Sequence, residues 1–204
     1  MFLIIETATV RGLIALCVGE KVLFEEPLTL GLANSRALEP ALEALCKKAA
    51  IRPQQLEFVA CGQGPGSYTG LRVGAACAKA IAVGCNIPLV AISSLKGFIP
   101  PADYRGDYTV CIDAKIGGIY ILEEGQEKLV PPEYLQGVKC VVTPQWEPLK
   151  NRISAEKVFE TGPSAHILAA EASKKFTKKE YSVDGTLPLL YMRLTQAEIE
   201  KKRT

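Results

Sequence analysis

Histidine is almost absent from this 204-residue chain, since His166 is the only one. A single imidazole excludes a metal site built from several histidines and weakens every mechanism that needs a histidine base. The seven cysteines include no C-x-x-C pair, and most of them lie in apolar stretches. An odd number of cysteines in such surroundings indicates buried, reduced thiols in a cytoplasmic protein rather than a disulfide framework.

Long apolar runs and a charge imbalance are missing as well. The longest candidate for a membrane span, residues 81–92, is interrupted by Asn86 and Pro88 and is shorter than the roughly 20 residues that a bilayer requires. The first residues carry no basic segment and no cleavage site, so we expect no secretory signal. With 24 basic and 22 acidic residues, the net charge of +2 gives no argument for binding nucleic acid or membranes through overall charge.

Two stretches of the chain share a strand, an acidic residue, a turn and a second strand. The first acid is Glu6, after the apolar residues 2–5, and the second is Asp113, after residues 108–112. The acids are about 107 residues apart, and the shared order indicates an internal repeat.

Between the two stretches, helices and strands alternate. After an initial three-stranded meander, apolar spacing predicts a helix, a strand, a helix and a strand over 35–50, 57–61, 69–83 and 88–92. The order βββαβαβ is that of a ribonuclease-H-like lobe. Further strands and one long helix are predicted over 117–122, 139–143, 158–161 and 164–176. We therefore expect an α/β fold with an N-terminal lobe over 1–98 and a smaller C-terminal lobe over 99–204, ending in a helix that begins near Thr195.

The most informative segment lies between a predicted strand and a predicted helix, where backbone N–H groups can hold an anion. Its loop consists of Gly64, Pro65, Gly66, Ser67, Tyr68 and Thr69. The segment is neither a Walker loop nor a dinucleotide fingerprint, because no Gly-Lys-Ser/Thr follows and Thr69 breaks the G-x-G-x-x-G spacing. A tight turn that lets the helix pack closely is the alternative interpretation.

The helix after this loop carries small residues at every fourth position, and no acidic residue occurs anywhere between Phe58 and Ala102. Either the helix is buried between a sheet and its neighbour, or part of its surface meets another subunit. Periodicity alone does not settle which side faces the sheet. We expect a partner interface formed with the preceding helix, from Leu38, Leu42, Leu45, Ala49, Gly70, Arg72, Gly74, Ala78 and Ala82.

Catalytic signals are weak. The nearest approach to a G-x-S-x-G elbow is residues 162–166, where His166 replaces the second glycine. Glu6 and Asp113 stand at strand ends where sugar kinases and actin-like ATPases place acids that organise a metal-bound nucleotide. Neither acid is followed by the glycine of a phosphate loop. A small-molecule phosphotransferase that uses both acids is the alternative function.

The segment from Gly64 to Gly74 closely resembles the G-P-G-S-[FY]-T-G-[LI]-R-[IV]-G signature of the TsaB family, also called YeaZ. The family acts in the biosynthesis of threonylcarbamoyladenosine in bacterial tRNA. In the first of four further similar segments, Glu6 stands where the family usually has aspartate. These segments, in the order of the family motifs, are 4–9, 34–40, 112–115 and 188–193. The resemblance spans nearly the whole chain.

This resemblance implies an actin-like ATPase (ASKHA) fold of two ribonuclease-H-like lobes, the second one reduced. It implies a non-catalytic scaffold for the paralogue TsaD, which transfers threonylcarbamoyl to adenosine 37 of tRNAs that read codons beginning with A. The ATPase TsaE joins this assembly. A metal site is not expected, because the histidine pair of TsaD has no counterpart here, and no cofactor is expected.

The resemblance also sets expectations about partners and place. tRNA would be contacted mainly through the complex, a homodimer could form when TsaD is absent, and the location would be the cytoplasm. An old glycoprotease label on relatives suggests a peptidase, which the single histidine disfavours.

Overall fold

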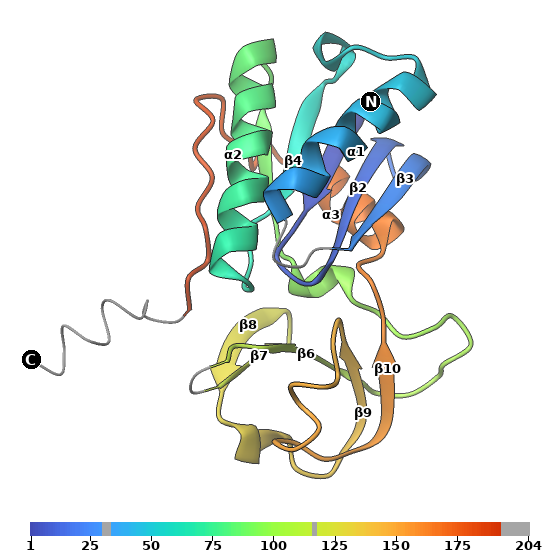
Figure 1. The fold of residues 1–204 in the computed structure, drawn as a ribbon, viewed down its shortest axis with the longest axis vertical. Helices are drawn as coiled ribbons and strands as arrows, with labels where there is room; N and C mark the ends of the chain where they lie inside the picture. The colour runs from blue at the N-terminus through green and yellow to red at the C-terminus, as the bar shows by residue number, and fades with distance from the viewer. Residues whose placement is uncertain (30–33, 116–117, 193–204) are drawn as a thin grey trace, which may run out of the picture.

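The computed structural model describes residues 1–29, 34–115 and 118–192, so the helix expected from Thr195 lies outside the described residues. Two sheets lie one above the other along the long axis (Figure 1). The first is built from β1 (Phe2–Glu6), β2 (Arg11–Val18), β3 (Lys21–Thr29), β4 (Phe58–Gly62) and β5 (Leu89–Ile92). The second is built from β6 (Thr109–Asp113), β7 (Ile119–Glu123), β8 (Gln126–Val130), β9 (Val138–Thr143) and β10 (Ala155–Glu160). The helices are α1 (Asn34–Ala49), α2 (Tyr68–Cys85) and α3 (Ala165–Thr177), with short 3-10 turns at η1 (Pro53–Gln55), η2 (Leu95–Gly97) and η3 (Pro132–Leu135).

The two sheets have the same strand order. The first runs β3-β2-β1-β4-β5 and the second β8-β7-β6-β9-β10. In both, the central strand is antiparallel to the strand that follows it in the chain and parallel to the fourth strand of its sheet. Glu6 ends β1 and Asp113 ends β6, the equivalent strand. This repeat confirms the predicted fold of two ribonuclease-H-like lobes.

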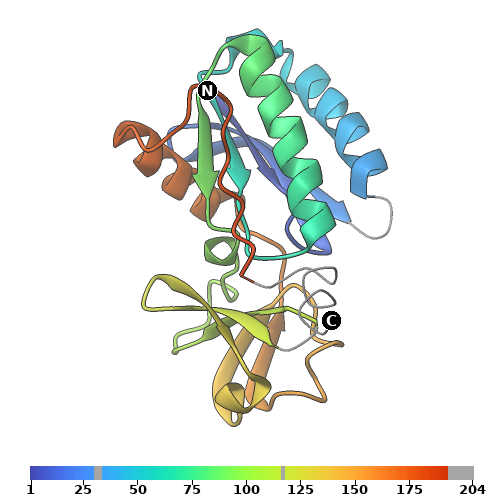
Figure 2. The ribbon, with the colours of Figure 1, turned by 90° about the vertical axis from the view of Figure 1, so that its left-hand side faces the viewer.

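Both faces of the first sheet are covered by helices, as Figure 2 shows. Leu3 and Ile5 point to the face that packs against α1 and α2, whereas Phe2 and Ile4 point to the face that packs against α3. Because β1 is buried on both faces, its sequence is a continuous apolar run rather than an alternating one.

Helix α3 lies in a different place from the one the sequence predicted. The prediction assigned all of 99–204 to the C-terminal lobe, but α3 packs on the first sheet. Phe58 stacks between Phe2 and Phe176, with ring centroids 4.3 and 4.2 Å apart. The boundary near residue 99 separates the sheets but not the helices, because the face of the first sheet opposite α1 and α2 needs an apolar cover. The buried residues of α3 are Ala165, Leu168, Ala169 and Ala172.

The segment that follows α3, residues 181–192, runs beside α2 toward the second lobe, and we call it the C-terminal strap (Figure 2). It begins with a bridge between Ser182 and Leu89 of the edge strand β5. Leu187 packs into the core beneath α1 and α2. Met192, at the far end, packs against an apolar cluster that includes residues of β6 and β7. The strap therefore contacts both lobes.

The second lobe is smaller because turns replace the helices of the first. The connection from β9 to β10 contains turns, and η3 stands between β8 and β9 where α1 stands in the first lobe. Strand β8 was not predicted, since its sequence is largely polar. It pairs with β7 through the turn at Glu124 and Gly125, both at positive φ, which is the backbone that tight hairpins require.

Candidate functional site

The signature loop, residues 64–69, lies against the turn that follows β1. The Ser67 N–H donates to the Ala8 carbonyl at 2.7 Å, and the Ser67 hydroxyl accepts from the Gly70 N–H at 3.3 Å. A Cβ atom at Gly66 would lie 2.3 Å from the Ala8 oxygen, so only glycine allows this approach. The contacts agree with the interpretation of the loop as a turn for close helix packing.

The stripe of small residues on α2 faces its own sheet. A Cβ at Gly70 would lie 2.1 Å from the Thr7 carbonyl oxygen, and one at Gly74 would lie 2.2 Å from the Thr7 hydroxyl. That hydroxyl donates to the Gly70 carbonyl at 2.8 Å. Ala78 and Ala82 are buried in the core. These residues therefore cannot form the surface that a partner touches, and the expectation that they do is wrong, because β1 already occupies the groove they leave.

The residues predicted on α1 also face inward. Leu38 and Leu45 are buried, and Leu42 and Ala49 are half-buried against the same core. Of the whole predicted interface, Arg72 is the residue with an exposed side chain.

The outward side of α2 is also poor in charge. Ala76, Ala80 and Val83 are exposed, Val83 by 57%. Arg72 and Lys79 are the charged residues of this helix, and both are exposed. This face could not be told from the buried stripe in the sequence, because residues 72, 76 and 80 have the same four-residue spacing. It is the part of α2 that another molecule can reach.

Glu6 is buried at the end of β1, with 1% of its surface exposed. One oxygen accepts from the Ala8 N–H at 2.6 Å, and the other has no hydrogen-bond partner among the described residues. Burial raises the pKa of the Glu6 carboxyl, although the Ala8 N–H and the nearby Ser94 hydroxyl oppose the shift. A Cβ at Gly62 would lie 2.1 Å from Oε2, so strand β4 closes over this carboxyl.

The carboxylate of Asp113 is paired with groups of its own lobe. Its Oδ1 accepts from the Lys115 N–H at 2.8 Å and from the guanidinium of Arg152. Arg152 also donates to the Gly118 carbonyl at 3.0 Å, which fixes the guanidinium beside the acid. Arg152 lies in a turn region without a motif, so no pattern in the sequence points to it.

These surroundings do not fit the metal-bound nucleotide that actin-like ATPases hold between their lobes. Glu6 is covered by β4, and Asp113 is neutralised by Arg152. His166 lies exposed on the first turn of α3. Within 1–29, 34–115 and 118–192, no group of three histidine, cysteine or acidic residues is arranged to hold a metal. In the same ranges, no helix is both long and apolar enough to cross a membrane.

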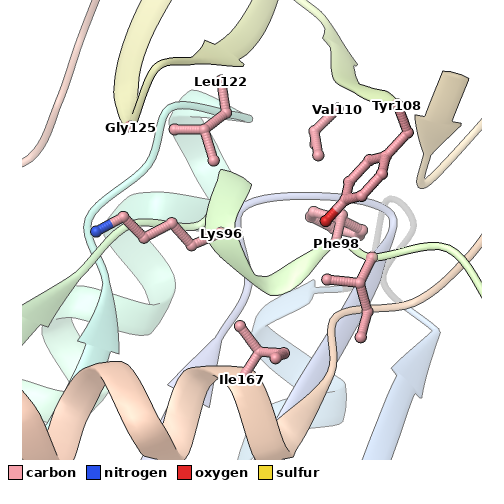
Figure 3. A pocket seen from close by; sticks show the side chains of 8 residues that line it. Lys96, Phe98, Tyr108, Val110, Leu122, Gly125 and Ile167 are labelled. Carbon is pink, nitrogen blue, oxygen red and sulfur yellow. The ribbon is translucent and has the colours of Figure 1, made fainter. Parts of the chain in front are cut away.

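A cavity of about 380 Å³ lies between η2, the second sheet and α3 (Figure 3). Its walls are mostly apolar, and its cation, Lys96, is paired with Glu171 at 2.8 Å. Lys96 is the charged residue of this lining, so the described lining offers no unpaired cation to a phosphate-bearing ligand. We therefore do not assign a nucleotide to this cavity. Its lining residues are Lys96, Phe98, Ile99, Tyr108, Val110, Leu122, Gly125 and Ile167.

We expect Glu6→Gln to remove a pH dependence of stability. Since the folded state raises the pKa of Glu6 above its ordinary 4.5, folding favours the protonated form. The free energy of unfolding of the wild type then falls as pH rises above 4.5 until the folded-state pKa is passed. Urea unfolding between about pH 4.5 and 8 should show the free energy of unfolding of the Gln variant rising relative to that of the wild type. For the exposed control Glu20→Gln, the difference from the wild type should stay constant over this range. A parallel profile for Glu6→Gln would contradict the burial of the charge.

We expect all seven cysteines to be free thiols. Burial raises the pKa of Cys17 and of Cys111 to about 12, and Cys61 and Cys140 are also buried. Cys17, Cys61 and Cys111 should resist iodoacetamide in the native protein near pH 8, because burial raises their pKa and the thiolate is the reactive form. Cys140 should resist it because its side chain is buried away from the reagent. Alkylation under denaturing conditions without reductant should give seven labels by mass spectrometry. Two or more unlabelled cysteines would show a disulfide.

Comparison with known proteins extends the resemblance seen in the sequence. Residues 27–191 match the family model described as TsaD: tRNA N6-adenosine threonylcarbamoyltransferase. A Haemophilus influenzae protein named tRNA threonylcarbamoyladenosine biosynthesis protein TsaB is 25% identical over 84% of this chain and 75% of its own length. A Bacillus subtilis protein of the same name is 33% identical over 58% of this chain and 52% of its own length. The solved structure titled YeaZ from Pseudomonas aeruginosa has a TM-score of 0.72 at 19% identity and covers 93% of this chain and 98% of that one.

Proposed function

Because the chain belongs to the TsaD family of tRNA N6-adenosine threonylcarbamoyltransferases, and within it to the TsaB (YeaZ) group, we propose that it acts in threonylcarbamoyladenosine biosynthesis as a partner without catalytic residues of its own. TsaD carries out the transfer, and this chain holds TsaD in its active arrangement. The tRNA modification takes place in the cytoplasm.

The observation that carries the non-catalytic assignment is the state of the two strand-end acids. In the ATPase fold these positions face the nucleotide, but here Glu6 is buried under Gly62 and Asp113 is paired with Arg152. A carboxylate that is desolvated or neutralised by its own chain is not available to organise a metal-bound phosphate. The same contacts give no support to the phosphotransferase alternative.

The docking surface for TsaD is the exposed face of α2 together with the adjoining part of α1. This face is small, apolar and free of acidic residues on α2, and the core of an interface is typically depleted in charge. Leu42 and Ala49 contribute their exposed fractions. In the absence of TsaD, the same face pairs two copies of this chain. TsaE joins the complex, and tRNA is contacted mainly through TsaD.

The test is a reconstitution with TsaD, TsaE, tRNA and threonylcarbamoyl-adenylate, with the modified nucleoside measured by mass spectrometry. We expect product only when this chain and TsaD are both present, and Asp113→Asn should support modification within about tenfold of the wild type, since no transition-state contact is removed. The chain alone should not hydrolyse ATP with magnesium. Sustained hydrolysis that Asp113→Asn abolishes would instead favour the phosphotransferase alternative.

A further inference from the structure

Two tyrosines and an arginine form an exposed cluster where the C-terminal strap crosses the start of α2. The rings of Tyr68 and Tyr191 lie 5.0 Å apart, and 41% and 44% of their surfaces are exposed. The Arg72 guanidinium lies 5.3 Å from the centre of the Tyr68 ring and donates to the Tyr68 hydroxyl at 2.8 Å. A cation held by both a ring and a hydrogen bond has few conformations to lose on binding.

The strap fixes the position of Tyr191 in this cluster. The Leu190 N–H donates to the Gln63 carbonyl at 2.8 Å, just before the signature loop. On one side Leu187 is packed in the core of the first lobe, and on the other Met192 packs against residues of the second lobe. Tyr191 is therefore held at a defined place although 44% of its surface is exposed.

Arg72 has no acidic partner among the described residues. No carboxylate in 1–29, 34–115 or 118–192 lies within ion-pair distance of its guanidinium, and the sequence from Phe58 to Ala102 contains no acid. Arg and Tyr are the residues most enriched among those that dominate binding energy in protein interfaces. An oriented guanidinium without a carboxylate is complementary to one.

The surroundings favour a protein over a nucleic acid as the source of the anion. Toward its C-terminal end, α2 continues outward from Arg72 with Ala76 and Ala80, and Lys79 is its second cation. Binding to a phosphate backbone relies on several cations in a row. A single oriented cation beside a small apolar face instead matches an acidic side chain that is flanked by apolar residues.

We propose that Tyr68, Arg72 and Tyr191 form an anchor that receives an acidic side chain of the partner protein, so that the C-terminal strap is part of the docking surface. This inference rests on the proposed function, because the partner is taken to be TsaD. Arg72 supplies the charge, and the two rings cover the apolar carbons next to the partner's carboxylate.

The test measures the affinity of TsaD for labelled variants of the full chain at two salt concentrations. Arg72→Gln and Tyr191→Ala should each weaken binding about tenfold or more, and Arg72→Glu should weaken it further. Binding of Arg72→Gln should also depend less on salt than that of the wild type, because an ion pair is lost. Lys178→Gln, at an exposed residue after α3 and away from the proposed docking surface, is the control and should bind like the wild type. Melting curves of each variant check folding, and Tyr191→Phe should restore affinity because it keeps the ring.

The outcomes separate the anchor from the function on which it rests. If wild-type chain does not bind TsaD, the proposed function fails and the anchor with it. If wild-type chain binds but Arg72→Gln and Tyr191→Ala bind equally well, the anchor is wrong and the proposed function stands. If these variants keep their affinity for TsaD but lose affinity for labelled tRNA, the cluster is a nucleic-acid contact and the proposal is overturned.

Discussion

Gly70→Ala is expected to destabilise the protein by about 3 kcal/mol or more, although it adds one methyl group to a helix. The added carbon would lie 2.1 Å from the Thr7 carbonyl oxygen, an atom of the backbone that cannot rotate away. Helix α2 would have to move off the turn after β1, and the hydrogen bond from the Thr7 hydroxyl to the Gly70 carbonyl would be lost. Urea unfolding followed by circular dichroism measures the loss.

Gly84→Ala is the matched control, since it makes the same change in the same helix. In the part of the chain that the structure describes, no atom lies within 4 Å of the Cβ position at Gly84. The intrinsic preference of alanine for helices should therefore stabilise this variant by up to about 1 kcal/mol. Equal stability of the two variants would mean that α2 does not pack on β1 as closely as described.

Ala76→Glu is expected to weaken the binding of TsaD about a hundredfold. Ala76 is exposed on the outward side of α2, so the charge is solvated in the free chain and stability should change by less than about 0.5 kcal/mol. On docking, the longer side chain would enter the apolar face and its carboxylate would compete for Arg72, four residues earlier on the same helix. We expect this to cost several kcal/mol of association, of the order of 3. Titration calorimetry with purified TsaD measures the affinity.

The controls for Ala76→Glu test the location of the docking surface as well as the effect of the added negative charge. Ala80→Glu, one turn further along the same face, should weaken binding similarly. Lys178→Glu, exposed after α3 on the opposite side of the first sheet, should leave the affinity unchanged. If Ala76→Glu and Ala80→Glu both bind TsaD as tightly as the wild type, the docking surface lies on another face of the molecule.

The repeat of the two lobes could be predicted because it produces recognisable patterns among residues that are adjacent in the sequence. A continuous apolar strand followed by an acid, a turn and a second strand occurs twice, and β1 and β6 lie where that pattern indicates. Helix α1 and helix α2 follow from apolar spacing for the same reason. Patterns of this kind need only neighbouring residues to be recognised.

The orientation of α2 could not be predicted, because small residues occur at four-residue spacing on both of its sides. The spacing of Gly70 and Gly74 is also that of Arg72 and Ala76, so the hydrophobic periodicity is the same for either side. What decides between them is Thr7, whose hydroxyl and carbonyl lie against the two glycines. That contact joins residues 63 positions apart, a distance at which a local pattern carries no information.

The same limit applies to the candidate site. Asp113 was singled out from its place at a strand end, but its partner Arg152 follows it by 39 residues and belongs to no motif. The burial of Glu6 depends on Gly62 and Ser94, which come from other segments. Contacts with residues distant in the sequence therefore show that these two candidate metal ligands are structural carboxylates.

The packing of α3 on the first sheet has a consequence for synthesis on the ribosome. Domains usually fold as units while the chain emerges, the N-terminal one first. Here the first lobe lacks the cover over Phe2, Phe58 and Val90 until α3 has been made, after the whole second sheet. During that interval one face of the nascent sheet stays open to water and to chaperones. The first sheet is thus covered on both faces only after the second sheet has been made, and the strands of the second sheet are free to pair before that.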